Sequence, residues 1–276
     1  MTSTTDTAEA WTAVAKAWDA EVDYVDEHSA AATAALLERV AVQLGDRVLE
    51  LAAGPGTLGA DWSRAVGPKG AVLLSDISPG MVAAAARRNA ELVNVQVNVI
   101  DASAIDRPDD SFDVVAARMG LMFVPQPSVA LGEIRRVIAP GGRFAALTWA
   151  GIEHNPWMTC VGMAAMMNGL VSGGPPTGPG GIFSLGDPAQ LEALVRDAGF
   201  TDVTVDAHDV RFLAPDIATH VERVAALAGP LAGALQQASS EQLAALRRTA
   251  ADLATPYVTD SGLDLPGRAL LVSARA

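Results

Sequence analysis

The sequence predicts an α/β protein built on a doubly wound, mostly parallel sheet of seven strands. Two observations carry this prediction. Apolar runs of strand length alternate with helical segments from residue 46 onward, and a glycine-rich turn directly follows the first apolar run. Alternating strands and helices form a parallel sheet with helices on both faces. A tight strand-to-helix turn rich in glycine is typical of the Rossmann-like members of this class.

The first 45 residues precede the first strand and are predicted to be helical. Trp11, Val14, Trp18 and Val22 recur at helical spacing, and residues 31–44 continue as a second helix that Gly45 ends. Because these helices come before the sheet, we expect residues 1–45 to lie across it as an N-terminal helical cap.

Residues 46–150 show the alternation of strands and helices most clearly. Ser78 followed by Pro79 predicts a capped helix start. Further helices are expected from Thr57 and through residues 130–138. The expected strands are 46–52, 71–76, 95–100, 112–117 and 142–149. This segment is therefore predicted to be the Rossmann-like core that binds a ligand.

The rest of the chain is predicted to complete the same single domain. Residues 171–183 are dense in glycine and proline, so we expect residues 151–186 to form a lid segment beyond the strand ends. Asp187 and Pro188 predict a helix start, and Gly199 its end. The C-terminal part, 187–276, then holds strands at 201–212 and 268–274, with a helical insertion over 215–257 broken near residues 229–230.

Composition excludes several classes of protein. Half of the 276 residues are hydrophobic and 18% are charged, which is typical of a globular protein. The net charge of -13 argues against a nucleic-acid partner. The single cysteine, Cys160, and the absence of zinc-ligand spacing predict no disulfide and no metal site. The first residues resemble no signal peptide and no apolar run is long enough to span a bilayer, so we expect a soluble cytoplasmic protein.

The glycine-rich turn raises the question of its ligand. Gly54, Gly56 and Gly59 form a G-x-G-x-x-G, and Asp76 follows Gly56 by about 20 residues, as in enzymes that bind NAD. Glu50, however, lies in the preceding strand, where a carboxylate about 4 Å from a phosphate would cost on the order of 4 kcal/mol. The same carboxylate favours a nucleoside with an ammonium and a sulfonium, such as S-adenosylmethionine. The alternative is that Glu50 points to solvent.

The motifs together resemble class I S-adenosylmethionine-dependent methyltransferases, of the type similar to the ubiquinone and menaquinone C-methyltransferases. They follow the order of that family: "VLELAAGPGTLG", "LLSDISPGMVAAAARR", "VIDASAIDRPDDSFDVVAARMGLMFVPQP", "ALGEIRRVIAPGGRFAALTW" and "NPW". The resemblance implies S-adenosyl-L-methionine as the cofactor and S-adenosyl-L-homocysteine as its product.

The resemblance also implies a role for particular residues. Glu50, Ala52, Gly54 and Gly56 would surround the methionine portion, and Asp76 would bind both ribose hydroxyls. The residues implied at the adenine are Ile77, Met81, Asp101 and Ala102, and those implied at the reacting methyl group are Arg118 and Met119. For Asp101 the alternative is a strand-end cap; Asp113 is predicted to be structural.

The chain departs from the family in two places. It has Ala52, Ala53 and Pro55 where relatives often carry other small residues or threonine; no turn glycine is lost. Met122 and Phe123 replace a pair of histidines found in many relatives, which suggests an apolar wall for the acceptor instead of polar catalysis. The residues expected at the acceptor are Trp18, Met122, Phe123, Trp149, Asn155 and Trp157. For the methionines the alternative is simple core packing.

Methyl transfer requires alignment of the nucleophile with the methyl group, and a general base helps only if the nucleophile is a phenol. His154 is the best-placed candidate base, and a surface histidine is the alternative. The sequence thus predicts methyl transfer to a small aromatic or lipid-like acceptor. A protein of the same fold that catalyses other chemistry, such as a cyclisation, or only binds a ligand stays open, as do, more remotely, an NAD-dependent oxidoreductase and a homodimer formed through the N-terminal helices.

Overall fold

The computed structural model describes residues 4–172 and 176–276. Residues 173–175, in the middle of the glycine- and proline-rich loop, lie outside the described residues. The strands are β1 (Arg47–Leu51), β2 (Ala71–Asp76), β3 (Val95–Val99), β4 (Phe112–Arg118), β5 (Ile138–Trp149), β6 (Thr201–Ala214), β7 (Val258–Thr259) and β8 (Gly262–Arg275). The helices are α1 (Thr4–Val40), α2 (Gly59–Val66), α3 (Pro79–Arg88), α4 (Pro127–Val137), α5 (Pro156–Met167), α6 (Pro188–Asp197), α7 (Ile217–Leu227), α8 (Gly229–Gln237) and α9 (Ser240–Ala254), with short 3-10 turns η1 (Leu121–Phe123), η2 (Ile152–His154) and η3 (Thr255–Tyr257).

The strands form a single sheet in the order β3-β2-β1-β4-β5-β8-β6. β1 to β5 run parallel to their neighbours, and β8 is antiparallel to both β5 and β6. The predicted doubly wound, mostly parallel sheet is confirmed, with the two-residue strand β7 added beside β8. The chain leaves β1 towards β3 and then returns to the other side of β1 as β4. Ligands of such sheets bind at this switch point, beyond the carboxyl ends of the strands.

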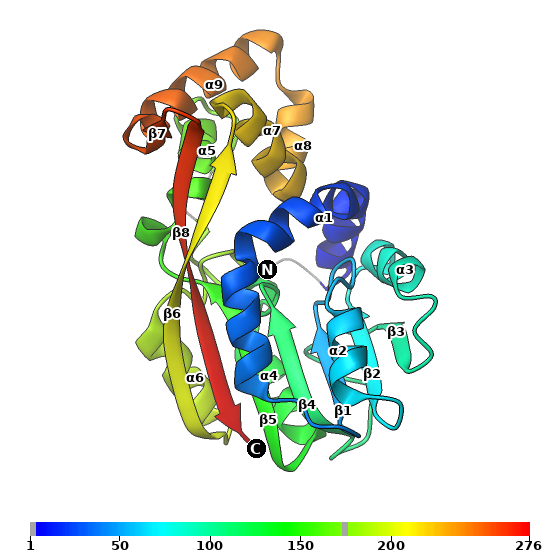
Figure 1. The fold of residues 1–276 in the computed structure, drawn as a ribbon. Helices are drawn as coiled ribbons and strands as arrows, with labels where there is room; N and C mark the ends of the chain where they lie inside the picture. The colour runs from blue at the N-terminus through cyan, green and yellow to red at the C-terminus, as the bar shows by residue number, and fades with distance from the viewer. Residues whose placement is uncertain (1–3, 173–175) are drawn as a thin grey trace.

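Helices cover both faces of the sheet (Figure 1). α1, α2 and α3 lie on one face, and α4 and α6 lie on the other. Strands β1 and β4 are central and covered on both sides, so nearly all of their side chains are buried. A third group of helices, α5, α7, α8 and α9, packs together at the carboxyl end of the sheet, beside the long β6–β8 ribbon. This group and the first half of α1 lie around the switch point.

The N-terminal segment is one helix, so the prediction of two helices is wrong. α1 continues from Thr4 to Val40, and residues 23–30 contain no glycine or proline that would prevent this. It ends where Ala41 takes a positive φ of 45°. Gly45, expected to end the helix, instead takes a φ of 93° in the turn before β1, where its N–H donates to the Val66 carbonyl.

The other predicted boundaries differ less from the structure. Ser78 and Asp187 cap α3 and α6 as predicted, each accepting hydrogen bonds from backbone N–H groups of the first turn. Gly199 follows the end of α6 with a φ of 89°. The helical stretch after β6 breaks a second time, before the capping box that Ser239 forms at the start of α9. None of the helices in the described ranges is long and apolar enough to cross a membrane.

Candidate functional site

The glycine-rich turn connects β1 to α2 at the switch point. Gly54 and Gly56 take positive φ values of 54° and 74°, a region that favours glycine. Gly59 has a different reason to be glycine, because a Cβ atom there would lie 2.0 Å from the side-chain oxygen of Asn89. The first two glycines therefore shape the turn, and the third lets α2 approach α3.

Residues at the end of α3 hold this turn in place. The Asn89 amide is buried and donates to the carbonyls of Gly56, at 2.9 Å, and Ala85, at 2.8 Å. Arg88 donates through Nε to the Pro55 carbonyl at 3.2 Å. The turn is thus fixed from its α3 side, while its backbone N–H groups face the strand ends.

Asp76, at the end of β2, is buried beside the turn. Its Oδ2 accepts the Gly54 N–H at 3.0 Å, and its Oδ1 accepts the Ser78 N–H at 2.9 Å. Burial raises the pKa of this carboxyl, and these backbone hydrogen bonds oppose the shift. Because a carboxylate oxygen can accept more than one hydrogen bond, each keeps capacity for a ligand hydroxyl.

Glu50 is 1% exposed, so the alternative in which it points to solvent is wrong. Its Oε2 accepts the Nε1–H of Trp62 on α2 at 2.8 Å. Burial raises the pKa of Glu50 to about 7, and the nearby Arg118 and the Trp62 hydrogen bond only partly offset this shift. A carboxylate held in this way is stabilised by any further positive charge brought beside it.

Arg118, at the end of β4, joins the turn to α1. Its Nη1 donates to Oδ1 of Asp26 at 2.6 Å, and its Nη2 donates to the Thr57 hydroxyl at 2.6 Å. The Thr57 hydroxyl in turn donates to the same Asp26 oxygen at 3.4 Å. The residue after Arg118, Met119, has a positive φ of 56°. A guanidinium and two carboxylates, those of Glu50 and Asp26, therefore surround the end of β1.

The residues expected at the adenine lie at the ends of β2 and β3. Asp101 is half-buried, and its Oδ1 accepts the Ser103 N–H at 2.8 Å. This oxygen therefore acts as a local cap, which was the alternative role for Asp101. Ala102 and Ile77 are also half-buried, whereas Met81 is buried under Val14 and Ala15 of α1. The first half of α1 thus covers this end of the site.

The residues expected at the acceptor fall into two separate groups. Trp18 and Phe123 both contact Trp11, with ring centroids 6.2 and 4.7 Å apart. The three rings are half-buried and join α1 to η1, the short turn that follows Met119 in the chain after one residue. Trp149 and Trp157 instead pack on Phe212, and Met122 is fully buried.

Asn155 has its side chain committed to local structure. Its amide nitrogen donates to the Ala150 and Gly151 carbonyls, and its Oδ1 accepts from Trp157 Nε1 and the Arg268 N–H. The residue is fully buried. These four bonds fix the segment after β5 and leave the amide no polar atom for an acceptor.

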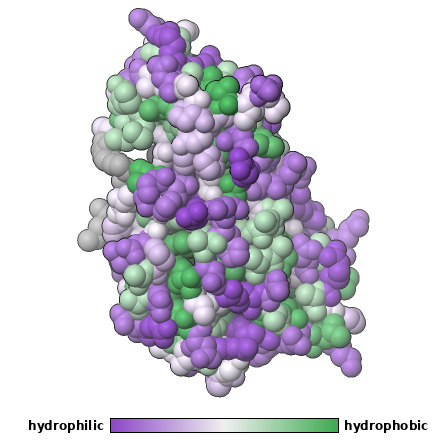
Figure 2. All heavy atoms as spheres, turned by 60° about the vertical axis from the view of Figure 1, so that its left-hand side comes forward, coloured by the Kyte–Doolittle hydropathy of each residue, from purple (hydrophilic) through white to green (hydrophobic). Residues whose placement is uncertain are grey.

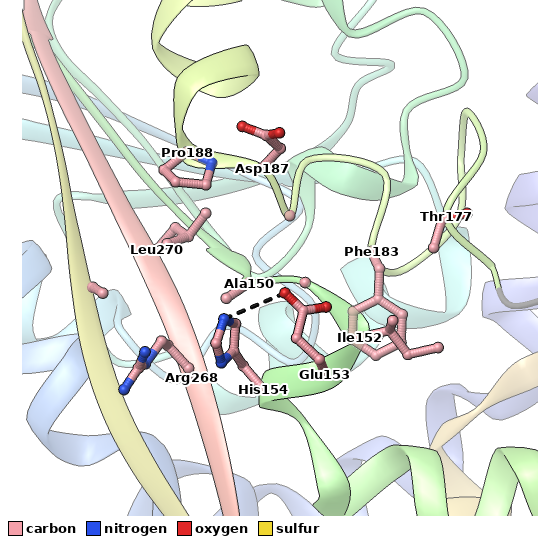
Figure 3. Close-up of a pocket in the computed structure, with 13 residues that line it drawn as sticks. Ala150, Ile152, Glu153, His154, Thr177, Phe183, Asp187, Pro188, Arg268 and Leu270 are labelled. Atoms are coloured by element: carbon pink, nitrogen blue, oxygen red, sulfur yellow. Dashed lines mark ion pairs between the residues drawn. The ribbon is translucent and has the colours of Figure 1, made fainter.

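His154 lines a different cavity, of about 420 Å³, between η2, the loop before α6, β6 and β8 (Figure 3). Its Nε2 lies 3.3 Å from Oε1 of Glu153, and Arg268 on the opposite wall pairs with Asp209 at 2.6 Å. None of the residues expected to bind the cofactor lines this cavity. The role of His154 as a general base stays a prediction, and the structure places it away from the glycine-rich turn.

Sequence reasoning missed several residues of the site. Trp62, Asn89 and Asp26 belong to no motif, and no spacing in the sequence joins them to Glu50, Gly56 or Arg118. Trp11 was recognised only as part of a helical stripe. Within residues 4–172 and 176–276, no cluster of three or more histidine, cysteine, aspartate or glutamate residues could hold a metal ion.

The strand order and the glycine-rich turn at its switch point define a Rossmann-like α/β protein with a site for a nucleoside-containing ligand. Residues 48–142 match the methyltransferase domain family. This match covers the part of the chain that runs from β1 into the first residues of β5.

Individual relatives agree with the family. The chain is 35% identical over 122 residues to the ubiquinone/menaquinone biosynthesis C-methyltransferase UbiE of Teredinibacter turnerae, covering 43% of this chain and 49% of that protein. The chain thus spans about half the length of the curated relatives it matches. Two solved structures share the fold. The [4+2]-cyclase SpnF has a TM-score of 0.57 and 21% identity, with 96% of each chain covered. Phosphoethanolamine N-methyltransferase 2 of Haemonchus contortus, solved with phosphomonomethylethanolamine and S-adenosylhomocysteine, has a TM-score of 0.58 and 17% identity, covering 93% of this chain and 57% of that one.

The packing of the turn predicts the effect of Gly59→Ala. The added methyl group would displace the buried Asn89 amide and its two hydrogen bonds, so we expect a loss of about 2 kcal/mol in the free energy of unfolding, measured with urea. Gly132→Ala is the matched control, because nothing lies within 4 Å of a Cβ there and α4 should gain about 1 kcal/mol. Equal effects of the two substitutions would contradict the close contact.

The burial of Glu50 predicts a pH-dependent gain from Glu50→Gln. The pKa of about 7 in the folded protein exceeds the ordinary glutamate pKa of 4.5. Wild-type stability is therefore lost as the pH rises from about 4.5 to 7, because the unfolded chain ionises first. The free energy of unfolding of the variant, relative to that of wild type, should therefore be about 2 kcal/mol higher at pH 8 than at pH 5.5. Urea unfolding at both pH values measures it.

Asp113→Asn is the control for this experiment. Its carboxylate pairs with Arg47, which holds its pKa below the usual value, so it stays ionised at both pH values. The difference between this variant and wild type should be constant between pH 5.5 and pH 8. A Glu50→Gln difference that is equally constant would show that the buried carboxyl does not titrate in this window.

Proposed function

We propose that the protein is an S-adenosylmethionine-dependent methyltransferase that acts on a small aromatic or lipid-like acceptor. One observation carries the proposal: a buried carboxylate, Glu50, lies beside a glycine-rich turn at the switch point of a methyltransferase-type sheet. A dinucleotide would bring phosphates to this carboxylate, whereas S-adenosylmethionine would bring an ammonium and a sulfonium.

The residues present fit this cofactor along its length. Glu50 would accept the ammonium beside the turn residues Ala52, Gly54 and Gly56. Asp76 would bind the ribose hydroxyls with the acceptor capacity that the Gly54 and Ser78 N–H groups leave. The remaining contacts would come from Ile77, Met81, Asp101 and Ala102 at the adenine and from Arg118 and Met119 at the methionine end.

When bound, S-adenosylmethionine supplies an electrophilic methyl group. The chain's own residues then have to orient the acceptor in line with that group and keep water out. The three aromatic rings of Trp11, Trp18 and Phe123 would form an apolar wall for the acceptor and would help to do both. The expected contacts of Met122, Trp149 and Trp157 would require these buried side chains to be uncovered.

Non-methylating chemistry is the second candidate function. The observation that favours it is the likeness in fold to the [4+2]-cyclase SpnF over nearly the full length of both chains. A nicotinamide-dependent oxidoreductase fits less well, because Glu50 would face the cofactor phosphates. Measuring the ligand and the product separates all three.

A cytoplasmic location also belongs to the proposal, whereas the structure gives no support to a homodimer formed through the N-terminal helix. On the face shown in Figure 2, hydrophilic residues cover most of the surface and apolar residues form small separate areas. That face therefore offers no apolar interface. The N-terminal helix, considered above as a dimer face, packs within the chain on α3, α7 and α8.

The cofactor assignment predicts the outcome of calorimetric titration. The protein should bind S-adenosylmethionine and S-adenosylhomocysteine at micromolar concentrations and should not bind NAD. Asp76→Ala should weaken binding of both nucleosides at least tenfold, because the ribose loses its acceptors. Thermal denaturation of the variant controls for loss of fold. Binding of NAD alone would overturn the proposal.

The reaction class predicts the mass of the product. Incubation with S-adenosylmethionine and a panel of phenols, quinols and amphiphilic lipids should yield an acceptor heavier by one methyl group, together with S-adenosylhomocysteine. Mass spectrometry measures both. A converted acceptor of unchanged mass, with no S-adenosylhomocysteine formed, would instead establish isomerising or cyclising chemistry.

A further inference from the structure

The two halves of α1 are held in different ways. In its second half, Ala32, Leu36 and Val40 are buried in the main core against the sheet. Its first half reaches over α3 (Figure 1) and meets it through a separate apolar cluster around Met81 and through polar groups. Asp19 pairs there with Arg87 and Arg88 at the end of α3. The second half is thus an anchor, and the first half is a cover over the proposed cofactor site.

The cover extends along the whole site. Thr12 meets Ser78 at 2.9 Å at the start of α3, and Asp26 meets Arg118 at 2.6 Å at the end of β4. At 1.5 Å per residue, these two contacts are about 21 Å apart along the helix. The interval contains Val14 and Ala15 over Met81. A nucleoside bound between Asp76 and Glu50 would therefore lie under this half of α1.

At the end of the cover, the Asp26 carboxylate forms an ion pair with Arg118. Its side chain is 33% exposed, and that of Arg118 is 12% exposed. Arg118 also holds Thr57 of the glycine-rich turn. A guanidinium in this setting is a receptor for a carboxylate, because its planar N–H groups match the two oxygens. The carboxylate that it binds in this structure comes from the chain itself.

An amino-acid moiety entering this place would bring one ammonium and one carboxylate. Glu50 would pair with the ammonium, and Arg118 is the cation beside Glu50 that would pair with the carboxylate, although its Nη2 also donates to Thr57 of the turn. With Asp26 in place, the ligand carboxylate would lie near the carboxyl groups of Glu50 and Asp26, and the Arg118 guanidinium would already be paired with Asp26. Like charges at such distances repel. Both carboxylates cannot share Arg118 without cost, so one must leave.

We propose that Asp26 occupies the subsite of the ligand's α-carboxylate and holds α1 closed over the proposed cofactor site, until that carboxylate displaces it from Arg118. This inference rests on the proposed function, since it assumes a cofactor with an amino-acid end. Asp26 is then a specificity-determining residue, because it lowers the affinity for ligands whose carboxylate has to pair with Arg118 and leaves the affinity for other ligands unchanged.

The test compares Asp26→Asn with wild type, using two nucleosides that differ at one end. S-adenosylhomocysteine carries the amino-acid moiety, and 5′-methylthioadenosine lacks it. By calorimetry, the variant should bind S-adenosylhomocysteine about fivefold more tightly, because a partly buried ion pair of about 1 kcal/mol no longer competes. Its affinity for 5′-methylthioadenosine should change less than twofold. Asparagine is close in size to aspartate, and thermal denaturation checks the fold.

Asp19→Asn is the matched control on the same helix. It removes the pairs with Arg87 and Arg88 and loosens the cover without touching Arg118, so it should alter binding of both nucleosides equally. Hydrogen exchange of the empty proteins gives a second measurement. Amides of residues 8–26 should exchange faster in both variants than in wild type.

Three results would overturn the inference, and they are distinguishable. Weaker binding of S-adenosylhomocysteine by Asp26→Asn would make Asp26 a direct ligand contact. Unchanged binding, or an equal gain for both nucleosides, would remove the competition with the carboxylate. If wild type binds none of S-adenosylmethionine, S-adenosylhomocysteine and 5′-methylthioadenosine, the proposed function itself fails, before any variant is compared.

Discussion

The buried carboxylate of Glu50 is the constraint around which the site is arranged. A charge removed from water must be met by hydrogen bonds and opposite charge, or it takes up a proton. Trp62 on α2 donates a hydrogen bond to Glu50, and Arg118 on β4 supplies the opposite charge. Glu50 therefore ties α2 and β4 to the end of β1. The raised pKa shows that this compensation is incomplete. A cationic ligand would therefore complete the compensation of this charge.

The glycine-rich turn depends on the same end of the sheet. Its shape follows from three residues with positive φ, Ala52, Gly54 and Gly56. Its position follows from Asn89 and Asp76, which bind it from α3 and β2. Because both neighbours are buried, the turn is preorganised before any ligand arrives. Ligand binding to such a site costs little free energy for ordering the backbone of the turn.

Helix α1 adds a movable element to this rigid frame. Its second half shares the main core with the sheet, while its first half is held by a separate apolar cluster around Met81 and by ion pairs and hydrogen bonds to α3 and Arg118. Partly exposed ion pairs are weaker than buried apolar packing, so the first half is held less firmly than the second. The aromatic rings that α1 carries at Trp11 and Trp18 move with the cover, so access for the cofactor and the wall for the acceptor are coupled.

The sequence by itself determined the sheet, the glycine-rich turn and the residues along the proposed cofactor, because these depend on local patterns: alternating apolar runs, caps such as Ser78, and a motif with fixed spacing. It did not determine that α1 is a single helix, because continuity over residues 23–30 depends on the surfaces that each half finds to pack against. Only the tertiary structure joined Asp26 to Arg118 and Trp62 to Glu50, and separated Trp18 and Phe123 from Trp149 and Trp157. These pairings connect positions far apart in the chain, where charge and burial decide the partner and no sequence spacing records it.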